Sequence, residues 1–391
     1  MTGMPYHAIA ARNVFDGITV LNDHAVIVDG CHIVDVVPRA NVPESMPVHA
    51  LRGDAWLAPG FIDVQVNGGG DVLFNDTPTS AGIQAIAAAH RRFGTTGLLP
   101  TLISDTPDKM RTAMTAAQTA AAENPAVLGI HFEGPFLSPD KPGVHDHEMF
   151  RAPTPGDLEL LTSWPSGNVL VTLAPECVSL DFIRELSLAG VRVSLGHSMA
   201  TYEQTQAALA AGLTGFTHLY NAMRPLGSRD PGPIAAALEA PAAWFGMIVD
   251  GAHVTPEMLR LALRGAAHPM LVTDAMPPVG GKEQTFTLYG QEISVRDGRC
   301  MRADGTLAGA AIDMASSVRN AVRDLHLPLT SALRFASTEP AEFLGLGTVL
   351  GRLAPGFRAD MVAFDAPDIR ILDTWIAGVP AAAHTHVAAD A

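Results

Sequence analysis

The chain alternates short apolar runs with longer stretches in which apolar and polar positions follow a helical period. Continuous apolar runs of this length are typical of buried strands in a parallel sheet. Five runs lead into a titratable or metal-binding side chain where they end: 127–130 into Glu133, 191–196 into His197, 215–217 into His218, 244–249 into Asp250 and His253, and 270–273 into Asp274. Because the carboxyl ends of parallel strands meet at one edge, this pattern predicts a (β/α)₈ TIM-type barrel with its active site there.

The barrel is predicted to span residues 55–349 and to contain eight strands. Its first strand covers 56–66, and the strands that bring no titratable group are expected at 96–102 and 169–173. The helical stretches between the strands lie at 83–93, 106–122, 179–189, 201–211, 233–240 and 255–264. After the last strand come a β-rich excursion at 283–304 and a helical stretch at 311–344.

The two ends of the chain predict a second, smaller unit. Residues 8–37 alternate β-branched runs with turns, and Asp29-Gly30 between two apolar runs predicts a hairpin. The segment 351–376 has the same character. We therefore expect a small β-sandwich domain built from 1–54 and 350–380. The last residues, 381–391, are rich in alanine and histidine and are expected to form a mobile tail.

The charge and composition of the chain limit where the protein is expected to act and which partners it is expected to have. The net charge of −15 argues against nucleic acid, whose binding needs a basic surface. No apolar run is long enough to cross a bilayer, and the N-terminus lacks the features of a signal peptide. Cys31, Cys177 and Cys300 are far apart and in no ligand spacing, so we expect reduced thiols. These features predict a cytoplasmic protein without membrane or nucleic-acid partners.

Glu133, His197 and His218 end three different strands, so a closed barrel would bring them to one cavity. A single histidine is more often a satisfied core residue, but three such side chains at strand ends favour a metal site. One carboxylate and two imidazoles suit Zn²⁺ and leave a position for water, whose pKa the ion lowers to about 7. Fe²⁺ accepts the same ligands. Asp274 ends the last strand and would exchange protons with that water as acid and base.

Several motifs run along the chain in an order that is similar to one family. They are Pro59-Gly-Phe-Ile-Asp63, His131-Phe-Glu-Gly-Pro135, Lys141-Pro-Gly-Val-His-Asp146, Ala174-Pro-Glu176, Gly196-His-Ser198, Thr217-His-Leu-Tyr-Asn-Ala-Met223, Asp250-Gly-Ala-His253, Val272-Thr-Asp-Ala275 and Leu307-Ala-Gly309. On these residues the chain resembles the N-acetylglucosamine-6-phosphate deacetylases of the amidohydrolase superfamily, and the resemblance covers essentially the whole chain.

The resemblance implies a role for each matching residue. Glu133, His197 and His218 would bind the metal, Asp274 would be the acid and base, and His145 would polarise the acetamide carbonyl. The sugar phosphate would be held by Asn221, Ala222, Arg229 and His253. The segment that covers the acetyl end would be Leu307, Ala308 and Gly309.

Two positions depart from the wider superfamily. Many amidohydrolases carry His-x-His after the first strand as half of a two-metal site, whereas this chain has Gln65-Val66-Asn67. An amide is a poor zinc ligand, and no lysine stands at a strand end to bridge two ions. We therefore expect one divalent metal per subunit, a variant that some members of the deacetylase family share. The residue before His145 is Val144, where the family often has a smaller residue or threonine, so the fit of the substrate would change there.

Arg229 lies in a loop with turn residues at both ends. A lone loop arginine is usually a solvated charge, but an acidic protein needs a local cation to bind an anionic substrate, and guanidinium matches phosphate. In the family that the chain resembles, an arginine of this loop reaches the phosphate site of a neighbouring subunit. The resemblance therefore implies a homodimer.

Together these features predict metal-dependent hydrolysis of N-acetyl-D-glucosamine 6-phosphate to D-glucosamine 6-phosphate and acetate, in amino-sugar catabolism. Metal-bound hydroxide would be the nucleophile. The alternatives are the galactosamine epimer or another amide as substrate, and a barrel that has lost catalysis and acts as a scaffold. A decayed enzyme should have lost one of Glu133, His197, His218 or Asp274, and all four are present.

Overall fold

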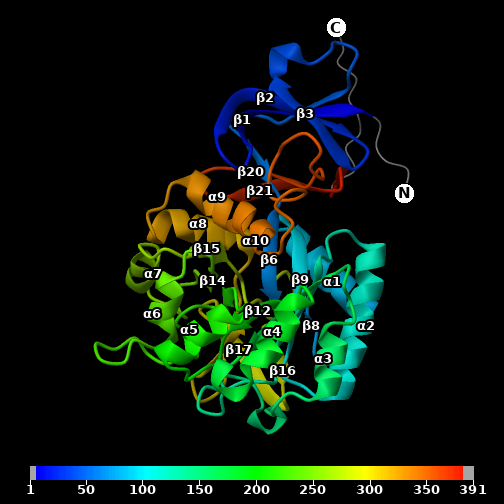
Figure 1. Cartoon of the computed structure of the whole chain (residues 1–391). Coiled ribbons are helices and arrows are strands. Elements are labelled where there is room, and N and C mark those ends of the chain that lie inside the picture. The colour runs from blue at the N-terminus through cyan, green and yellow to red at the C-terminus, as the bar shows by residue number, and fades with distance from the viewer. Residues whose placement is uncertain (1–5, 382–391) are drawn as a thin grey trace. The chain divides into compact units, whose positions relative to one another are not determined.

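The computed structural model describes residues 6–381 (Figure 1). Contact density divides the described residues into two compact units: residues 6–62, 91–97 and 314–381 lie in one, and 63–90 and 98–313 form the other. The predicted boundaries near residues 55 and 349 stay predictions, since contact density does not mark where a part folds alone. The predicted tail at 381–391 lies almost wholly outside the described residues. Within 6–381, no helix is both long enough and apolar enough to cross a membrane.

The first unit contains a sheet built from both ends of the chain, as the sequence predicts. Its strands follow the order β22-β21-β20-β5-β1-β2-β3, and β4 also pairs with β1. The strands are β1 (His7–Phe15), β2 (Val20–Asp29), β3 (His32–Pro38), β4 (Val48–Ala50), β5 (Trp56–Pro59), β20 (Met361–Asp365), β21 (Arg370–Ile376) and β22 (Val379–Pro380). Asp29 faces His32 across the predicted hairpin turn, where Gly30 has a φ of 58°. Ile9, Val28 and Trp375 share one buried core.

Three helices belong to the same unit: α8 (Met314–Asp324), α9 (Leu329–Ala336) and α10 (Thr338–Phe343). They occupy the stretch predicted to be helical. Helices α8 and α9 each bury one face, with Val318 and Leu333 as examples, whereas α10 is buried almost throughout and includes the buried Phe343.

The second unit is built around a parallel ring of eight strands, in the order β6-β9-β10-β11-β12-β13-β14-β15. The strands are β6 (Phe61–Val66), β9 (Thr95–Ile103), β10 (Gly129–Glu133), β11 (Asn168–Leu173), β12 (Arg192–Leu195), β13 (Gly215–Phe216), β14 (Trp244–Met247) and β15 (His268–Leu271). The chain after β15 returns to β6: the Asp274 amide donates to the Gln65 carbonyl at 3.0 Å, and Val66 bridges Ala275. This contact closes the predicted barrel.

Helices lie outside the ring of strands (Figure 1). They are α1 (Ser80–Arg91), α2 (Pro107–Glu123), α3 (Pro155–Leu161), α4 (Leu180–Leu188), α5 (Tyr202–Ala210), α6 (Gly232–Glu239) and α7 (Pro256–Ala262). Thr201 caps α5. Its hydroxyl oxygen accepts a hydrogen bond from the Gln204 backbone N–H, and the Gln204 side-chain oxygen accepts one from the Thr201 backbone N–H. The short helix α3 is not among the helices that the sequence predicts.

The predicted first barrel strand at 56–66 is in fact two strands. β5 belongs to the sheet of the first unit, β6 belongs to the ring, and Gly60 separates them. A Cβ at Gly60 would lie 2.0 Å from the Thr96 hydroxyl oxygen, so only glycine fits. The apolar run is continuous across the break because both strands are buried, and periodicity alone could not reveal the change of sheet.

The predicted β excursion forms a four-stranded antiparallel sheet within the second unit. Its strands are β16 (Thr285–Leu288), β17 (Gln291–Arg296), β18 (Arg299–Met301) and β19 (Leu307–Ala310). Ile293 and Ala308 of this sheet share a buried cluster with Ile103, Val144 and Met276. A two-stranded ribbon, β7 (Gly68–Gly69) with β8 (Val72–Leu73), follows β6.

Candidate active site

The side chains predicted to carry the chemistry meet at the carboxyl ends of the ring strands. Glu133 is the last residue of β10, while His197, His218 and Asp274 follow β12, β13 and β15. These last three have positive φ angles of 49°, 31° and 52°. Residues with side chains adopt this conformation rarely, and such strain collects at functional sites.

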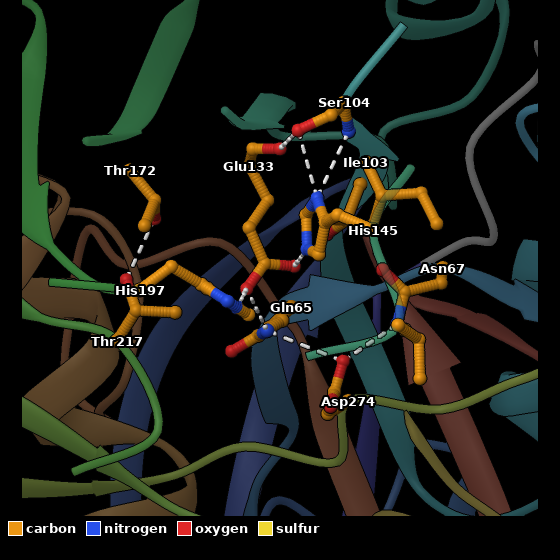
Figure 2. A network of polar contacts seen from close by, with 12 residues as sticks. Gln65, Asn67, Ile103, Ser104, Glu133, His145, Thr172, His197, Thr217 and Asp274 are labelled. Atoms are coloured by element: carbon orange, nitrogen blue, oxygen red, sulfur yellow. Dashed lines mark hydrogen bonds and ion pairs between the residues drawn. The ribbon is translucent and has the colours of Figure 1, made fainter. Parts of the chain in front are cut away.

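Glu133, His197 and His218 form one buried group whose ligand atoms all lie within 4.8 Å of one another. Glu133 Oε1 is 3.2 Å from His197 Nε2 and 2.9 Å from His218 Nε2 (Figure 2 shows Glu133 and His197). The structure thus brings together the three residues predicted to bind metal, and their role stays a prediction.

The donor set fits a divalent cation. Burial alone would raise the pKa of Glu133, but hydrogen bonds from His197 and His218 hold it well below its usual value. Burial opposes charge on His218 in the same way, yet the Glu133 carboxylate raises its pKa. The surroundings therefore favour positive charge at this point. His197 Nδ1 lies 2.9 Å from the Lys141 carbonyl, which can only accept, so Nδ1 carries a proton and Nε2 is the ring nitrogen that faces Glu133.

A layer of buried polar side chains lies inside the ring of strands, beneath the candidate metal ligands. His131 Nε2 is 2.8 Å from the Thr172 hydroxyl, Thr172 is 2.6 Å from Thr217, and Thr217 donates to Ser194 at 2.8 Å (Figure 2 shows Thr172 and Thr217). Burial lowers the pKa of His131 to about 4, so the ring is neutral at pH 7. The layer satisfies polar groups inside the ring and links β10 to β13. The sequence predicts His131 only as part of a motif and does not predict this role.

Asp274 is held by the two amides that replace His-x-His. Asn67 Nδ2 donates to Asp274 Oδ1 at 2.6 Å, and Gln65 Nε2 donates to the same oxygen at 3.2 Å (Figure 2). Gln65 Nε2 also lies 3.3 Å from Glu133 Oε1. Burial and the neighbouring Glu133 carboxylate raise the pKa of Asp274 to about 6. A carboxyl group with such a pKa suits proton transfer near neutral pH.

His145 lies on the loop after β10, and its Nε2 is 3.9 Å from Glu133 Oε2. Its Nδ1 lies 3.2 Å from the Ser104 amide nitrogen and 2.8 Å from the Ser104 hydroxyl oxygen (Figure 2). Burial and then the nearby His197 lower the pKa of His145 to about 3. The imidazole is therefore neutral at pH 7.

A cavity of about 250 Å³ opens above these groups. Eleven of the predicted site residues line it: Glu133, Val144, His145, His197, His218, Asn221, Ala222, His253, Asp274, Leu307 and Gly309. Five further lining residues are not among the predicted site residues: Asn67, Ile103, Gly143, Met276 and Thr306. Ile103 is an apolar residue whose place at the end of β9 is a signal that could have found it, whereas Met276 is an apolar residue in the segment after β15 and carries no such signal.

Two predicted substrate residues do not line the cavity. Ala308 is fully buried between its two lining neighbours. Arg229 is exposed on the loop before α6. This loop is closed at its base by the Arg224–Asp230 ion pair at 2.6 Å, and Arg224 also donates to the Met199 carbonyl at 3.1 Å.

The cavity has little positive charge of its own. Among the residues from 6 to 381, no lysine or arginine lines it. His253 does, and its Nδ1 lies 2.7 Å from Asp250 Oδ2. Burial alone would raise the pKa of Asp250, but the bond from His253 outweighs burial and the net pKa is lowered.

A parallel eight-stranded barrel with a carboxylate and two imidazoles at its strand ends defines the class of metal-dependent hydrolases. The chain matches the amidohydrolase family over residues 56–382 and the NagA composite domain over residues 7–55. It therefore belongs to the amidohydrolase family and is a hydrolase, as the sequence predicts.

Comparison with individual proteins shows which members of the family the chain is similar to. The chain is 44% identical over 334 residues to an N-acetylgalactosamine-6-phosphate deacetylase of Shewanella sp. (strain ANA-3), covering 84% of each. It is 34% identical to the N-acetylglucosamine-6-phosphate deacetylase of Haemophilus influenzae, covering 93% of this chain and 96% of that one. The crystal structure of the Pasteurella multocida N-acetylglucosamine-6-phosphate deacetylase superimposes with a TM-score of 0.93 at 35% identity, over 97% and 100% of the two chains.

Proposed function

We propose that the protein hydrolyses the acetamide of N-acetyl-D-glucosamine 6-phosphate to D-glucosamine 6-phosphate and acetate. The observation that supports this most is the convergence of Glu133, His197, His218, His145 and Asp274 on one cavity in a chain similar to such deacetylases over nearly its whole length. In this assignment Leu307 and Gly309 enclose the acetyl end, and Val144 lies beside the catalytic His145.

Glu133, His197 and His218 would hold one divalent ion, most simply Zn²⁺, with Fe²⁺ as the alternative. Such an ion acts as a Lewis acid on a carbonyl and lowers the pKa of a bound water. The amide pair Gln65 and Asn67 points its hydrogens at Asp274, so this side of the cavity offers no second set of ligands.

Asp274 moves the proton in this scheme. Its carboxylate takes a proton from the attacking water and delivers one to the sugar nitrogen as the C–N bond breaks. His145, neutral and facing the cavity, donates a hydrogen bond to the carbonyl oxygen as negative charge develops there. Both side chains are buried in the protein and line the same cavity.

The phosphate is proposed to bind to Asn221, Ala222 and His253, with Arg229 donated by a second subunit. Support comes from the cavity, which lacks a lysine or arginine among the described residues, and from the exposed, tethered loop that carries Arg229. A homodimer is part of this proposal, and a cytoplasmic location stays a prediction.

Mixing inactive subunits tests the donated arginine. Asp274→Asn and Arg229→Ala subunits should regain activity when mixed, because one site of each heterodimer has both residues intact. In the homodimeric Arg229→Ala variant, loss of a charge-assisted contact should lower kcat/KM for the phosphorylated sugar by about 10- to 150-fold. The kcat/KM for unphosphorylated N-acetylglucosamine should be unchanged. Failure of confirmed heterodimers to recover would contradict donation between subunits.

The galactosamine epimer is a second candidate substrate. It is favoured by the 44% identity to the Shewanella enzyme, which exceeds the 34% identity to the Haemophilus one. Acetate release should be measured from both epimeric 6-phosphates with Zn²⁺- and Fe²⁺-loaded protein. A higher kcat/KM for the glucosamine epimer supports the first assignment, and the reverse supports the second. No release from either sugar would refute both.

A further inference from the structure

The orientation of His145 is set by Ser104, the residue that follows β9. The Ser104 backbone N–H points at His145 Nδ1 across 3.2 Å, and the Ser104 hydroxyl oxygen lies 2.8 Å from the same atom (Figure 2). A backbone N–H can only donate, so Nδ1 must accept. A neutral imidazole has one proton, which therefore resides on Nε2, the nitrogen nearer to the Glu133 carboxylate.

Ser104 is itself held from the four-stranded sheet. The Tyr289 hydroxyl donates to the Ser104 carbonyl at 2.6 Å. Arg302, just after β18, donates from Nη2 to the Val144 carbonyl at 2.9 Å, next to His145 in the chain. One sheet therefore holds both sides of the contact between Ser104 and His145. The end of β9 is also held by Asn75. Its side chain accepts a hydrogen bond from the Ile103 backbone N–H at 3.1 Å and donates one to the Ile103 carbonyl at 2.9 Å.

The position of Tyr289 in its turn is a second, independent sign. Tyr289 and Gly290 form the two-residue hairpin turn between β16 and β17, and their φ angles are 48° and 74°. Turns with two positive φ angles favour Asn, Asp or Gly at the first position, and a bulky residue there is an outlier. Such local violations are expected where a side chain is needed for another purpose. The hydroxyl bond to Ser104 provides one.

We propose that Ser104 fixes His145 as the Nε2–H tautomer, and that Tyr289 and Arg302 are positioning residues that make the four-stranded sheet part of this arrangement. The kinetic consequence rests on the proposed function, because His145 must donate a hydrogen bond to the substrate carbonyl. The tautomer itself does not depend on any activity. If Tyr289 only fills its turn, substituting it should lower the stability of the protein without a specific effect on turnover.

The tautomer is tested by long-range proton–nitrogen NMR on zinc-loaded protein with ¹⁵N-labelled histidine, using His145→Gln to assign the signals. We expect a pyridine-like Nδ1 and a pyrrole-like Nε2 for His145. The opposite pattern would overturn the assignment whether or not the protein deacetylates sugars. Ser104→Ala keeps the backbone N–H and should therefore keep the same pattern.

The sheet is tested by Tyr289→Phe, which removes one oxygen and keeps the ring. Loss of one hydrogen bond should lower kcat by about three- to tenfold with little change in KM or metal content, because the contact acts through a transition-state donor. The matched control is Tyr202→Phe. The Tyr202 hydroxyl donates to Glu239 at an exposed position, so kcat should be unchanged in this variant. An unchanged kcat in Tyr289→Phe, with the parent enzyme active, would reject the positioning role. An inactive parent would instead refute the proposed function.

Discussion

Two neighbouring sides of the same ring of strand ends line the cavity, and their side chains have different roles. On the ligand side, Glu133, His197 and His218 bring their ligand atoms within 4.8 Å of one another and favour a positive charge between them. On the amide side, Gln65 and Asn67 point hydrogens at Asp274. Strands of the same sheet thus provide either a cation site or a cradle for a proton-transfer group, depending on whether imidazole or amide stands at their ends. The predictions below separate the two sides.

The largest effect is expected from Asp274→Asn. An amide cannot shuttle a proton, so kcat should fall by about 10²- to 10⁴-fold. The ligand side is untouched, so metal content by elemental analysis should equal that of the parent. A kcat within tenfold of the parent would show that Asp274 is not the acid and base.

On the ligand side, His197→Ala or His218→Ala should lower metal affinity by at least about a hundredfold, since even residues behind a ligand cost up to that much. Activity should return partly at high metal concentration, which no concentration of metal should achieve in Asp274→Asn. The control is His147→Ala, an exposed histidine two residues from His145. Stoichiometric metal in either ligand variant would remove that residue from the site.

On the amide side, Asn67→Leu keeps the approximate volume and removes the 2.6 Å bond to Asp274. A hydrogen bond to a charged group contributes about 1.5–3 kcal/mol, so kcat/KM should fall by about 10- to 150-fold with metal retained. Gln65→Leu removes a longer bond and should cost less. Loss of the metal in Asn67→Leu would mean that the two sides are not separate.

The smallest effect concerns Asp63, which is buried in β6 beneath the amide side. Burial raises its pKa to about 7 despite hydrogen bonds from Thr273 and the Gln65 amide. A carboxyl group whose pKa is raised on folding binds more protons when folded, so the free energy of unfolding should fall as pH rises from about 4 to 7. Asp63→Asn should flatten this slope. The difference between the two proteins in denaturant titrations at pH 5 and 8 measures it, and equal slopes would contradict the shift.

Much of this architecture is visible in the sequence because strand ends and chemistry coincide. The apolar runs before Glu133, His197 and Asp274 predict where each side chain lies, since parallel strands align their carboxyl ends. The same reasoning could not separate β5 from β6, because both are buried and the break depends on contact between Gly60 and Thr96. Periodicity measures burial, and burial does not say which sheet a strand joins.

The fine structure of the site was less accessible. The sequence predicts only that Gln65 and Asn67 are poor zinc ligands, whereas the structure shows that their side chains donate hydrogen bonds to Asp274. Such a role needs the distance to Asp274, more than two hundred residues away in the chain. The role of Tyr289 likewise depends on a distance, since only the structure shows that its hydroxyl reaches the Ser104 carbonyl.

The seam that closes the barrel has one more consequence. Asp274 donates its amide to the first ring strand, through the Gln65 carbonyl, and its own carbonyl accepts the Ala310 amide of β19. The residue proposed to move the proton is thus also a backbone link between the first and last parts of the ring. Local opening of this seam, which costs less than global unfolding, would displace the acid and base while most of the fold persists. Heat or mild denaturant should therefore abolish turnover before it melts the helices, and slow hydrogen exchange at this amide should report how long the enzyme stays competent.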